Sequence, residues 1–349
     1  MKKVFIVFFI LCAFVNIPCL AQIEENKVDW GVHSMDYSDV GTAGWQFLKL
    51  PTNARTASMG GINSSISLGN ANAALTNPAS TANVNNLDIA FTNMNWVADI
   101  HFQTLSIVKN FDKWGTFGIN AIYVDYGEEI RTEYTQVTTP TQIIFTPALD
   151  QGTVGASDLA AGLSYARSIT DKLKVGGNIR YLQEKIDDAL LSTWSLDIGT
   201  MFYTGFKTLR ISMLGRSFGP DAEFHEYKDR IEKVPFRVKM PMSLSIGAAM
   251  DLFQETPDMP HRLIAAAEYL VPNDGPKKLH MGLEYTLKDL LALRAGYKFN
   301  YDVEGLTLGG GVNYKMQSMS IHIDYAYLDA GLFNQVHMFT IGIHKASKK

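Results

Sequence analysis

The sequence predicts an all-β protein, a transmembrane antiparallel β-barrel of about 14 strands. Three observations support this class. Most of the chain alternates apolar and polar residues with the period of a β-strand. The polar positions carry full charges and glycines in mid-strand, where a soluble barrel would need packed aliphatic side chains. The N-terminus also resembles a secretory signal peptide, as expected for a protein that leaves the cytoplasm.

Residues 1–21 form the predicted signal peptide. Lys2 and Lys3 make its basic start, and the apolar core over 4–15 is too short to span a bilayer as a helix. Small residues precede a cleavage position after Ala21. We therefore expect a cleaved leader and export to the outer membrane of a Gram-negative bacterium.

Both cysteines of the chain, Cys12 and Cys19, lie within this leader. Lipidation at Cys19 is an alternative, although 16–18 (Asn-Ile-Pro) is a poor approach to a lipid-modified cysteine. The mature chain then has no disulfide and no thiolate metal site. Without the leader, 29 basic residues face 35 acidic ones, a net charge of −6, and no basic cluster suggests nucleic acid as a partner.

Residues 22–86 are predicted to form an N-terminal plug. This segment does not alternate and is rich in glycine and other small residues. A loop-rich stretch of this length is unusual unless it is functional or packed inside something, and ahead of a barrel that place is the lumen. The predicted plug motif comprises Arg55, Gly60, Gly61, Asn77, Pro78 and Ala79. We expect Arg55 to meet a luminal carboxylate such as Glu284 or Asp324.

Residues 87–345 are predicted to form the barrel, with 346–349 as a basic tail. Fourteen strand-like runs are expected near 87–96, 100–109, 115–126, 158–168, 172–183, 193–204, 207–216, 241–252, 261–270, 279–286, 290–300, 305–316, 319–328 and 335–344. Nearly every second connection is short, and the long ones, Gly127–Ser157 and Phe218–Met240, fall in the other set. Barrels with periplasmic termini sort their turns and loops in this way.

The alternation also assigns faces to the strands. The predicted lipid-facing side chains include Leu283, Leu293, Tyr297, Leu308, Ile321 and Ile323. The predicted luminal charge network comprises Arg180, Asp197, Arg210, Asp251, Glu268, Glu284, Arg294, Lys298, Lys315 and Asp324. Equal numbers of positive and negative groups favour charges that pair with one another and with the plug. An open ion-selective pore would favour one sign instead.

The residues give no indication of catalysis. The eight histidines are scattered, and none has the spacing of a known metal-binding motif. The chain has no Gly-x-Ser-x-Gly motif, no P-loop and no dinucleotide fingerprint. We therefore expect a non-enzymatic protein with no catalytic residues, no metal site and no cofactor.

The two long connections are candidate contact surfaces. Their candidate partner residues are Tyr134, Ile143, Ile144, Phe145, Phe224, Tyr227 and Ile231. In the first connection, apolar groups in a polar loop suggest a binding site. In the second, the helical spacing of the aromatic and aliphatic residues suggests a short amphipathic helix, which either binds a partner or caps the barrel.

Several phrases, in order, resemble the PorV/PorQ family of outer-membrane proteins, whose barrels look like those of the FadL fatty-acid transporters. They include Gly41–Pro51, Ala54–Gly61, Thr76–Ser80, Asn95–Ile100 and Leu293–Lys298. The resemblance covers nearly all of the mature chain. It implies a plugged barrel of fourteen strands and, for some members, a role in type IX secretion.

The expected function is therefore type IX protein secretion or surface attachment of cargo. The expected partners are outer-membrane lipid, components of the secretion machinery and secreted cargo proteins. The alternative is a FadL-like transporter of long-chain fatty acids or other hydrophobic molecules. That alternative needs an apolar pocket beside the plug.

Overall fold

The computed structural model describes residues 40–131, 133–138, 143–148, 152–187, 189–223, 237–256, 260–333 and 335–345. The predicted signal peptide, residues 22–39 of the predicted plug segment and the basic tail lie outside these ranges. For the two short ranges between 133 and 148, only the backbone is described.

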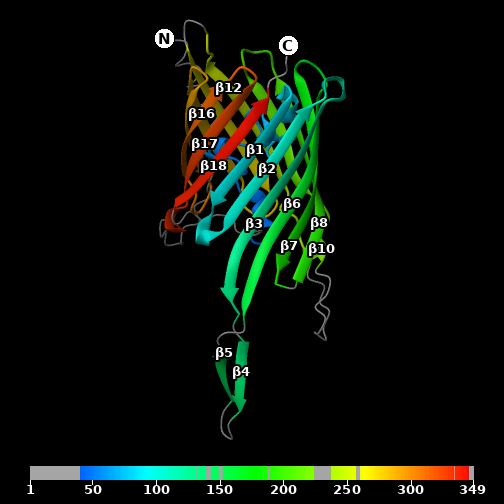
Figure 1. The fold of residues 1–349 in the computed structure, drawn as a ribbon, viewed down its shortest axis with the longest axis vertical. Helices are drawn as coiled ribbons and strands as arrows, with labels where there is room; N and C mark the ends of the chain where they lie inside the picture. Colours follow the sequence, from blue (N-terminus) through cyan, green and yellow to red (C-terminus); the bar gives the residue numbers. More distant parts are fainter. Residues whose placement is uncertain are drawn as a thin grey trace, which may run out of the picture. The chain divides into compact units, whose positions relative to one another are not determined.

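Fourteen strands close into one antiparallel barrel, in the order β1-β18-β17-β16-β15-β14-β13-β12-β9-β8-β7-β6-β3-β2 (Figure 1). The strands are β1 Leu87–Asn95, β2 His101–Asn110, β3 Thr116–Ile130, β6 Thr153–Ser168, β7 Leu173–Ile186, β8 Ala189–Tyr203, β9 Arg210–Phe218, β12 Ser243–Phe253, β13 His261–Pro272, β14 Lys278–Leu287, β15 Leu291–Phe299, β16 Leu306–Lys315, β17 Met319–Asp329 and β18 Gln335–Lys345. Each coincides with one predicted run, so the predicted all-β class and strand number are confirmed.

The two ends of the barrel differ in their connections. At the short-turn end, where β1 begins and β18 ends, tight connections such as 288–290 and 316–318 join the strands. The long-loop end carries the connections from β3 to β6 and from β9 to β12. This sorting agrees with the predicted alternation of short and long connections.

The connection from β3 to β6 is not the loop that the sequence predicts over Gly127–Ser157. The two barrel strands run on to Ile130 and from Thr153, and between them β4 (Glu133–Thr138) pairs with β5 (Ile143–Ala148) as a separate hairpin. The β-branched residues of these segments favour extended backbone, which explains the additional strand pairing. The β9–β12 connection contains two short paired strands, β10 (Ala222–Glu223) and β11 (Arg237–Val238).

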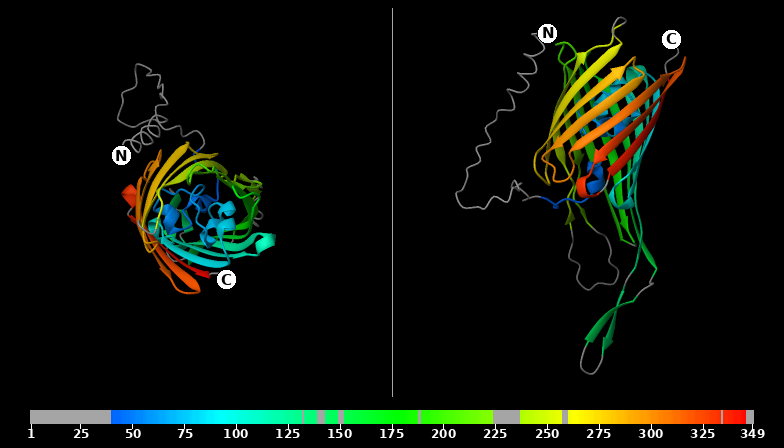
Figure 2. Two further views of the ribbon diagram at one scale, coloured as in Figure 1. Left: turned by 90° about the horizontal axis from the view of Figure 1, so that it is seen from above. Right: turned by 90° about the vertical axis from the view of Figure 1, so that its left-hand side faces the viewer.

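Residues 43–86, called here the luminal segment, lie within the ring of strands (Figure 2). The segment contains η1 (Gln46–Lys49), α2 (Ala54–Ala57), η2 (Ala71–Ala74) and η3 (Pro78–Asn83). It enters at the long-loop end, where Gly44 N donates to Lys239 O (3.0 Å). It leaves at the short-turn end, where Asn110 Nδ2 donates to Val84 O (2.8 Å). Its role as a plug remains a prediction.

The predicted facing of the strands matches the observed exposure. Leu293 is 67 % exposed on the outer surface, whereas the neighbouring Arg294 is 8 % exposed and points inward. Leu283, Tyr297, Leu308 and Ile323 are exposed in the same way, and Ile321 is half-buried. In the described part of the chain, no helix has the length and apolar character needed to cross a membrane.

Candidate functional site in the barrel lumen

Inward-facing glycines of the barrel wall mark where the luminal segment packs. A Cβ at Gly282 would lie 2.5 Å from Met59 O, and one at Gly296 would overlap Gly60 N. Gly60 itself has φ of 75°, and a Cβ there would lie 2.8 Å from Met281 O. The backbone therefore turns against a stretch of wall that has no side chains, which requires glycine on both sides.

The Asn-Pro-Ala element of the predicted plug motif packs against a second pair of wall glycines. Asn77 accepts from Ala79 N, and Pro78 occupies the first turn of η3, where its missing N–H costs nothing. The Asn77 amide donates to Ser64 O (2.7 Å) and Thr200 O (3.2 Å). Gly176 and Gly199 leave room for this turn, because a Cβ at either position would clash with it.

Gly296→Leu should displace the luminal segment and leave the wall intact, because the new side chain needs the space of Gly60. We expect higher single-channel conductance in planar bilayers and faster proteolysis between residues 43 and 86. The matched control is Gly310→Leu on the outer face of the neighbouring strand, where a Cβ meets nothing closer than 3.4 Å. Equal conductance of the two variants would contradict this packing.

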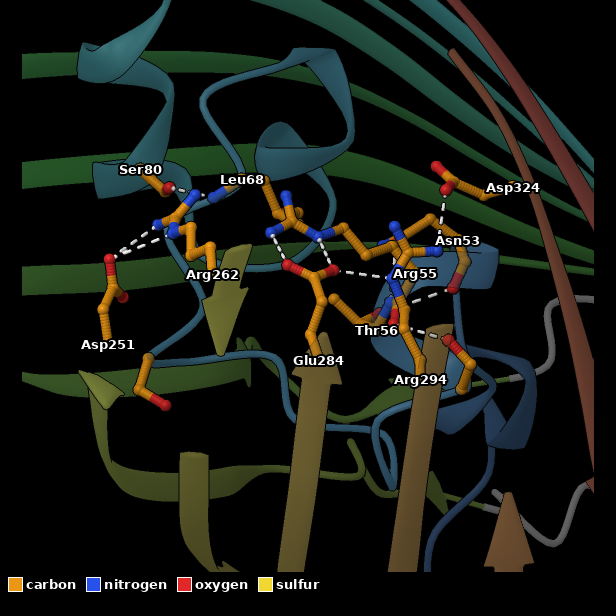
Figure 3. Close-up of polar contacts among 12 residues, drawn as sticks. Asn53, Arg55, Thr56, Leu68, Ser80, Asp251, Arg262, Glu284, Arg294 and Asp324 are labelled. Carbon is orange, nitrogen blue, oxygen red and sulfur yellow. Dashed lines mark hydrogen bonds and ion pairs between the residues drawn. The ribbon is translucent and has the colours of Figure 1, made fainter. Parts of the chain in front are cut away.

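The centre of the lumen holds a chain of ion pairs that joins the luminal segment to three strands (Figure 3). Asn53 caps α2 by accepting from Thr56 N, and this cap starts the turn that carries Arg55. Arg55 donates to both oxygens of Glu284 (2.7 and 2.6 Å). Arg294 donates to Glu284 (2.6 Å) and Asp324 (2.7 Å). The structure thus places Arg55 against a carboxylate named from the sequence.

The other inward charges form separate groups, so the predicted network is not continuous. Arg180 pairs with Asp197 on the β7–β8 wall. Arg210 pairs with Asp251 (3.1 Å) on the β9–β12 wall. Lys298 pairs with Glu304 (2.6 Å) near the long-loop end. Each of these three pairs joins one cation to one carboxylate.

Two members of the predicted network do not belong to it. Lys315 lies exposed at the short-turn end and pairs with Asp289, because β16 ends at that residue and its side chain reaches solvent. Glu268 is buried but forms no ion pair with a described residue. It accepts from Asn63 N (2.9 Å) and from Ser64 N and Oγ (both 2.6 Å). Backbone N–H groups and a hydroxyl replace the expected cation.

Three charged residues outside the predicted network lie close to these groups. Arg262 donates to Asp251 (3.0 Å), and Glu304 is the partner of Lys298. Arg216 is buried and donates to Leu48 O (3.2 Å). The two arginines lie on inward positions of β13 and β9, so the same period of two could have identified them. Glu304 lies in the connection between β15 and β16, where side chains do not alternate between two faces.

One side of the lumen is apolar, which corrects the expected polar interior. In the half nearer the long-loop end, inward side chains of neighbouring strands form a continuous buried patch, the apolar chamber. Its wall residues are Met94, Phe102, Ile122, Val124, Leu182, Leu191, Leu328, Val336 and Met338. These positions meet protein instead of water, because the luminal segment fills the space in front of them.

The first turn of the luminal segment fills this chamber. Trp45, Phe47 and Leu48 are each 2 % exposed and belong to the same apolar cluster as the wall. Trp45 has φ of 54°, a left-handed conformation that strains a bulky side chain. Its indole nitrogen has no partner among the described residues. The three side chains are therefore held in the chamber by apolar packing, while the backbone of the turn is hydrogen-bonded, with Leu48 N donating to Trp45 O (3.0 Å).

The predicted partner residues of the two long connections are not tested by the structure. The side chains of Tyr134, Ile143, Ile144 and Phe145, and the residues Phe224, Tyr227 and Ile231, lie outside the described part of the structure. Within the described residues, no group of three or more His, Cys, Asp or Glu side chains is arranged to hold a metal ion.

Comparisons with known proteins show which family and which solved structures this chain resembles. The model of an uncharacterised protein family, UPF0164, matches residues 31–182. No curated protein matches the sequence. Among solved structures, the CymD monoaromatic hydrocarbon channel is similar over 86 % of this chain and 99 % of its own, with a TM-score of 0.55 and 11 % identity. The toluene transporter TodX of Pseudomonas putida is similar over 83 % and 96 %, with a TM-score of 0.52 and 14 % identity. The barrel therefore has the fold of these channels.

Proposed function

We propose that this protein is a non-enzymatic outer-membrane channel through which hydrophobic molecules cross. The apolar chamber is the observation that carries the proposal. A lumen for ions or polar solutes presents polar side chains to water, whereas sites for hydrophobic ligands are concave, apolar and furnished with a few polar groups. Here nine inward side chains from several strands build such a surface inside a barrel.

The outer surface supports a place in the membrane. Large apolar side chains such as Leu163, Ile198 and Ile246 are exposed around the barrel. Such a surface is stable in a bilayer and is a liability in water. With this placement, the short-turn end faces the periplasm and the long-loop end faces outward.

In this proposal the luminal segment acts as the plug. Trp45, Phe47 and Leu48 occupy the space that an apolar ligand would need. A ligand that displaces this turn replaces one set of apolar contacts by another and relieves the strain at Trp45. The central ion pairs of Arg55 anchor the rest of the segment during the exchange. Passage then requires movement of the first turn only.

The solved structures support the same reading. CymD is described as a monoaromatic hydrocarbon channel and TodX as a toluene transporter. These names concern molecules that are neutral and apolar, which fits the apolar side chains of the chamber. Long-chain fatty acids are the second class of cargo that we propose to test.

Type IX secretion, which the PorV/PorQ resemblance implies, is the second candidate function. The observation that favours it is the β4–β5 hairpin, a pair of strands outside the barrel sheet whose outer edges pair with no other described strand. Free strand edges are templates for pairing with another chain, and added strands are a common mode of peptide recognition. A cargo protein or a secretion component would be the partner.

Uptake of labelled toluene and labelled oleate tests the first candidate. A Gram-negative host that lacks its own hydrophobic-uptake barrel should take up at least one of them severalfold faster when it expresses this chain. Phe102→Glu should return uptake to the level of the empty host, because a carboxylate in the apolar chamber repels apolar ligands.

Phe102→Leu is the matched control and should retain uptake, since it keeps the chamber apolar. Heat-modifiability on gels checks that each barrel is folded. Uptake by the wild-type chain that equals that of the empty host would refute the channel. If, in addition, deletion of the gene in the native bacterium removes secreted proteins from the medium, type IX secretion becomes the favoured function.

A further inference from the structure

A cavity of about 360 Å³ lies beside the luminal segment at the long-loop end and is called here the mouth cavity. It is lined by the η1 turn, by inward residues of β9 and β12 to β15, and by the connections that follow β13 and β15. Unlike the apolar chamber, it is rich in charge. Lys49, Arg216, Lys278 and Lys298 face it, as do three carboxylates.

The three carboxylates already have partners within the chain. Asp274 pairs with Lys49 and accepts from Gln46 Nε2 (3.1 Å). Glu304 pairs with Lys298 (2.6 Å). Glu268 accepts the three hydrogen bonds from Asn63 and Ser64 described above. None of them therefore needs a cation from a ligand.

Two of the cations have no such partner. Among the described residues, no ion pair involves Arg216 or Lys278. Arg216 is 8 % exposed and donates to the uncharged carbonyl of Leu48, while its Nε has no acceptor among the described residues. Lys278 places its ammonium 3.8 Å from the centre of the Tyr301 ring. Carboxylates act on both groups only without direct contact, Glu268 on Arg216 and Glu304 and Asp274 on Lys278, so the donors of both cations can bind an anion.

His280 and Tyr301 also line the cavity. His280 is 3 % exposed, and its Nε2 lies 2.9 Å from the Tyr301 hydroxyl. Burial, with Glu304 and Glu268 nearby, raises the pKa of Tyr301, so this ring stays neutral and continues to hold Lys278. The cavity thus offers two cations that form no direct ion pair, one of them held beside a neutral ring.

We propose that the mouth cavity is a binding site for an oxyanion group, a phosphate, sulfate or carboxylate, held by Arg216 and Lys278. Arginine presents a planar fork of donors to such groups, and lysine adds a mobile charge. The site is separate from the apolar chamber and goes beyond the proposed passage of hydrophobic molecules. The two meet at Leu48, which belongs to the chamber cluster and also lines the cavity. The oxyanion is either a free ion or the charged end of an amphiphile.

Equilibrium dialysis of the purified full chain in a neutral detergent and a phosphate-free buffer tests the site. Labelled inorganic phosphate probes the free ion, and labelled octanoate probes an oxyanion with an apolar tail. We expect saturable binding of at least one of them, at one site per chain. Tighter binding of phosphate identifies a free-ion site, and tighter binding of octanoate identifies an amphiphile site that extends towards Leu48.

Lys278→Gln and Arg216→Gln should each weaken binding at least tenfold. Lys278 is half-buried and forms no ion pair, so its variant should fold and can decide the question even if the other variant does not. The matched control is Lys315→Gln, which removes a lysine at the opposite end of the barrel and should bind like the wild type. Absence of saturable binding of both anions, or Lys278→Gln binding like the wild type, would overturn the proposal. Because no transport is measured, these outcomes are independent of the uptake assay.

Discussion

Replacing Glu284 with Gln is expected to lower the free energy of unfolding by roughly 3–5 kcal/mol, the usual cost of removing one partner from a buried ion pair. Glu284 is 2 % exposed and accepts from both Arg55 and Arg294. Arg294 keeps its bond to Asp324, but Arg55 loses its bidentate carboxylate partner. The Gln side chain fills the same volume as Glu. The decrease in the free energy of unfolding therefore measures the lost charge interaction and not a change in packing. Reversible unfolding in guanidinium, with the barrel folded into lipid vesicles, measures it.

The exposed pair at the short-turn end is the control for this measurement. Asp289→Asn breaks the bond to Lys315, whose side chain is 61 % exposed, and should cost no more than about 1 kcal/mol. The double variant Arg55→Gln/Glu284→Gln should recover part of the loss, because it leaves no unpaired arginine from this contact. Equal losses for Glu284→Gln and Asp289→Asn would show that the luminal segment is not anchored at this point.

Leu283→Arg is expected to cost roughly 2–4 kcal/mol in the same assay, because it places a charge on the lipid-facing side near the middle of β14. Leu283 is 49 % exposed, and on the outer face it lies between Ala265 and Ala295. Those small neighbours cannot shield an arginine. The long side chain would have to reach one of the two interfaces or deform the bilayer.

Leu306→Arg is the matched control, since Leu306 is similarly exposed (44 %) but begins β16 at the long-loop end. Near an interface the expected cost is about 0–1 kcal/mol. A cost that does not depend on depth would argue against a barrel that spans a membrane. It would leave the fold unchanged and remove the basis of the proposed channel.

Much of the barrel could be predicted from the sequence because β-strand alternation is a local property. The side chains of Leu293 and Arg294 point to opposite faces for the same reason in any sheet, so strand number, order and facing follow from neighbouring residues. The segments around β4 and β5 were the exception. They alternate less clearly, so the sequence alone predicts a loop there.

The contents of the lumen were decided by tertiary structure. Arg55 and Glu284 are 229 positions apart, and no local pattern specifies which inward charges meet across the barrel. Glu268 accepts from backbone N–H groups in place of a cation because the luminal segment passes beside it. Lys315 pairs with Asp289 in solvent because β16 ends at Lys315. The apolar chamber shows the same dependence. Strand alternation in the sequence places the apolar side chains of Phe102 and Val124 on the inward face. Only the packing of Trp45 and Phe47 against them excludes water from that wall.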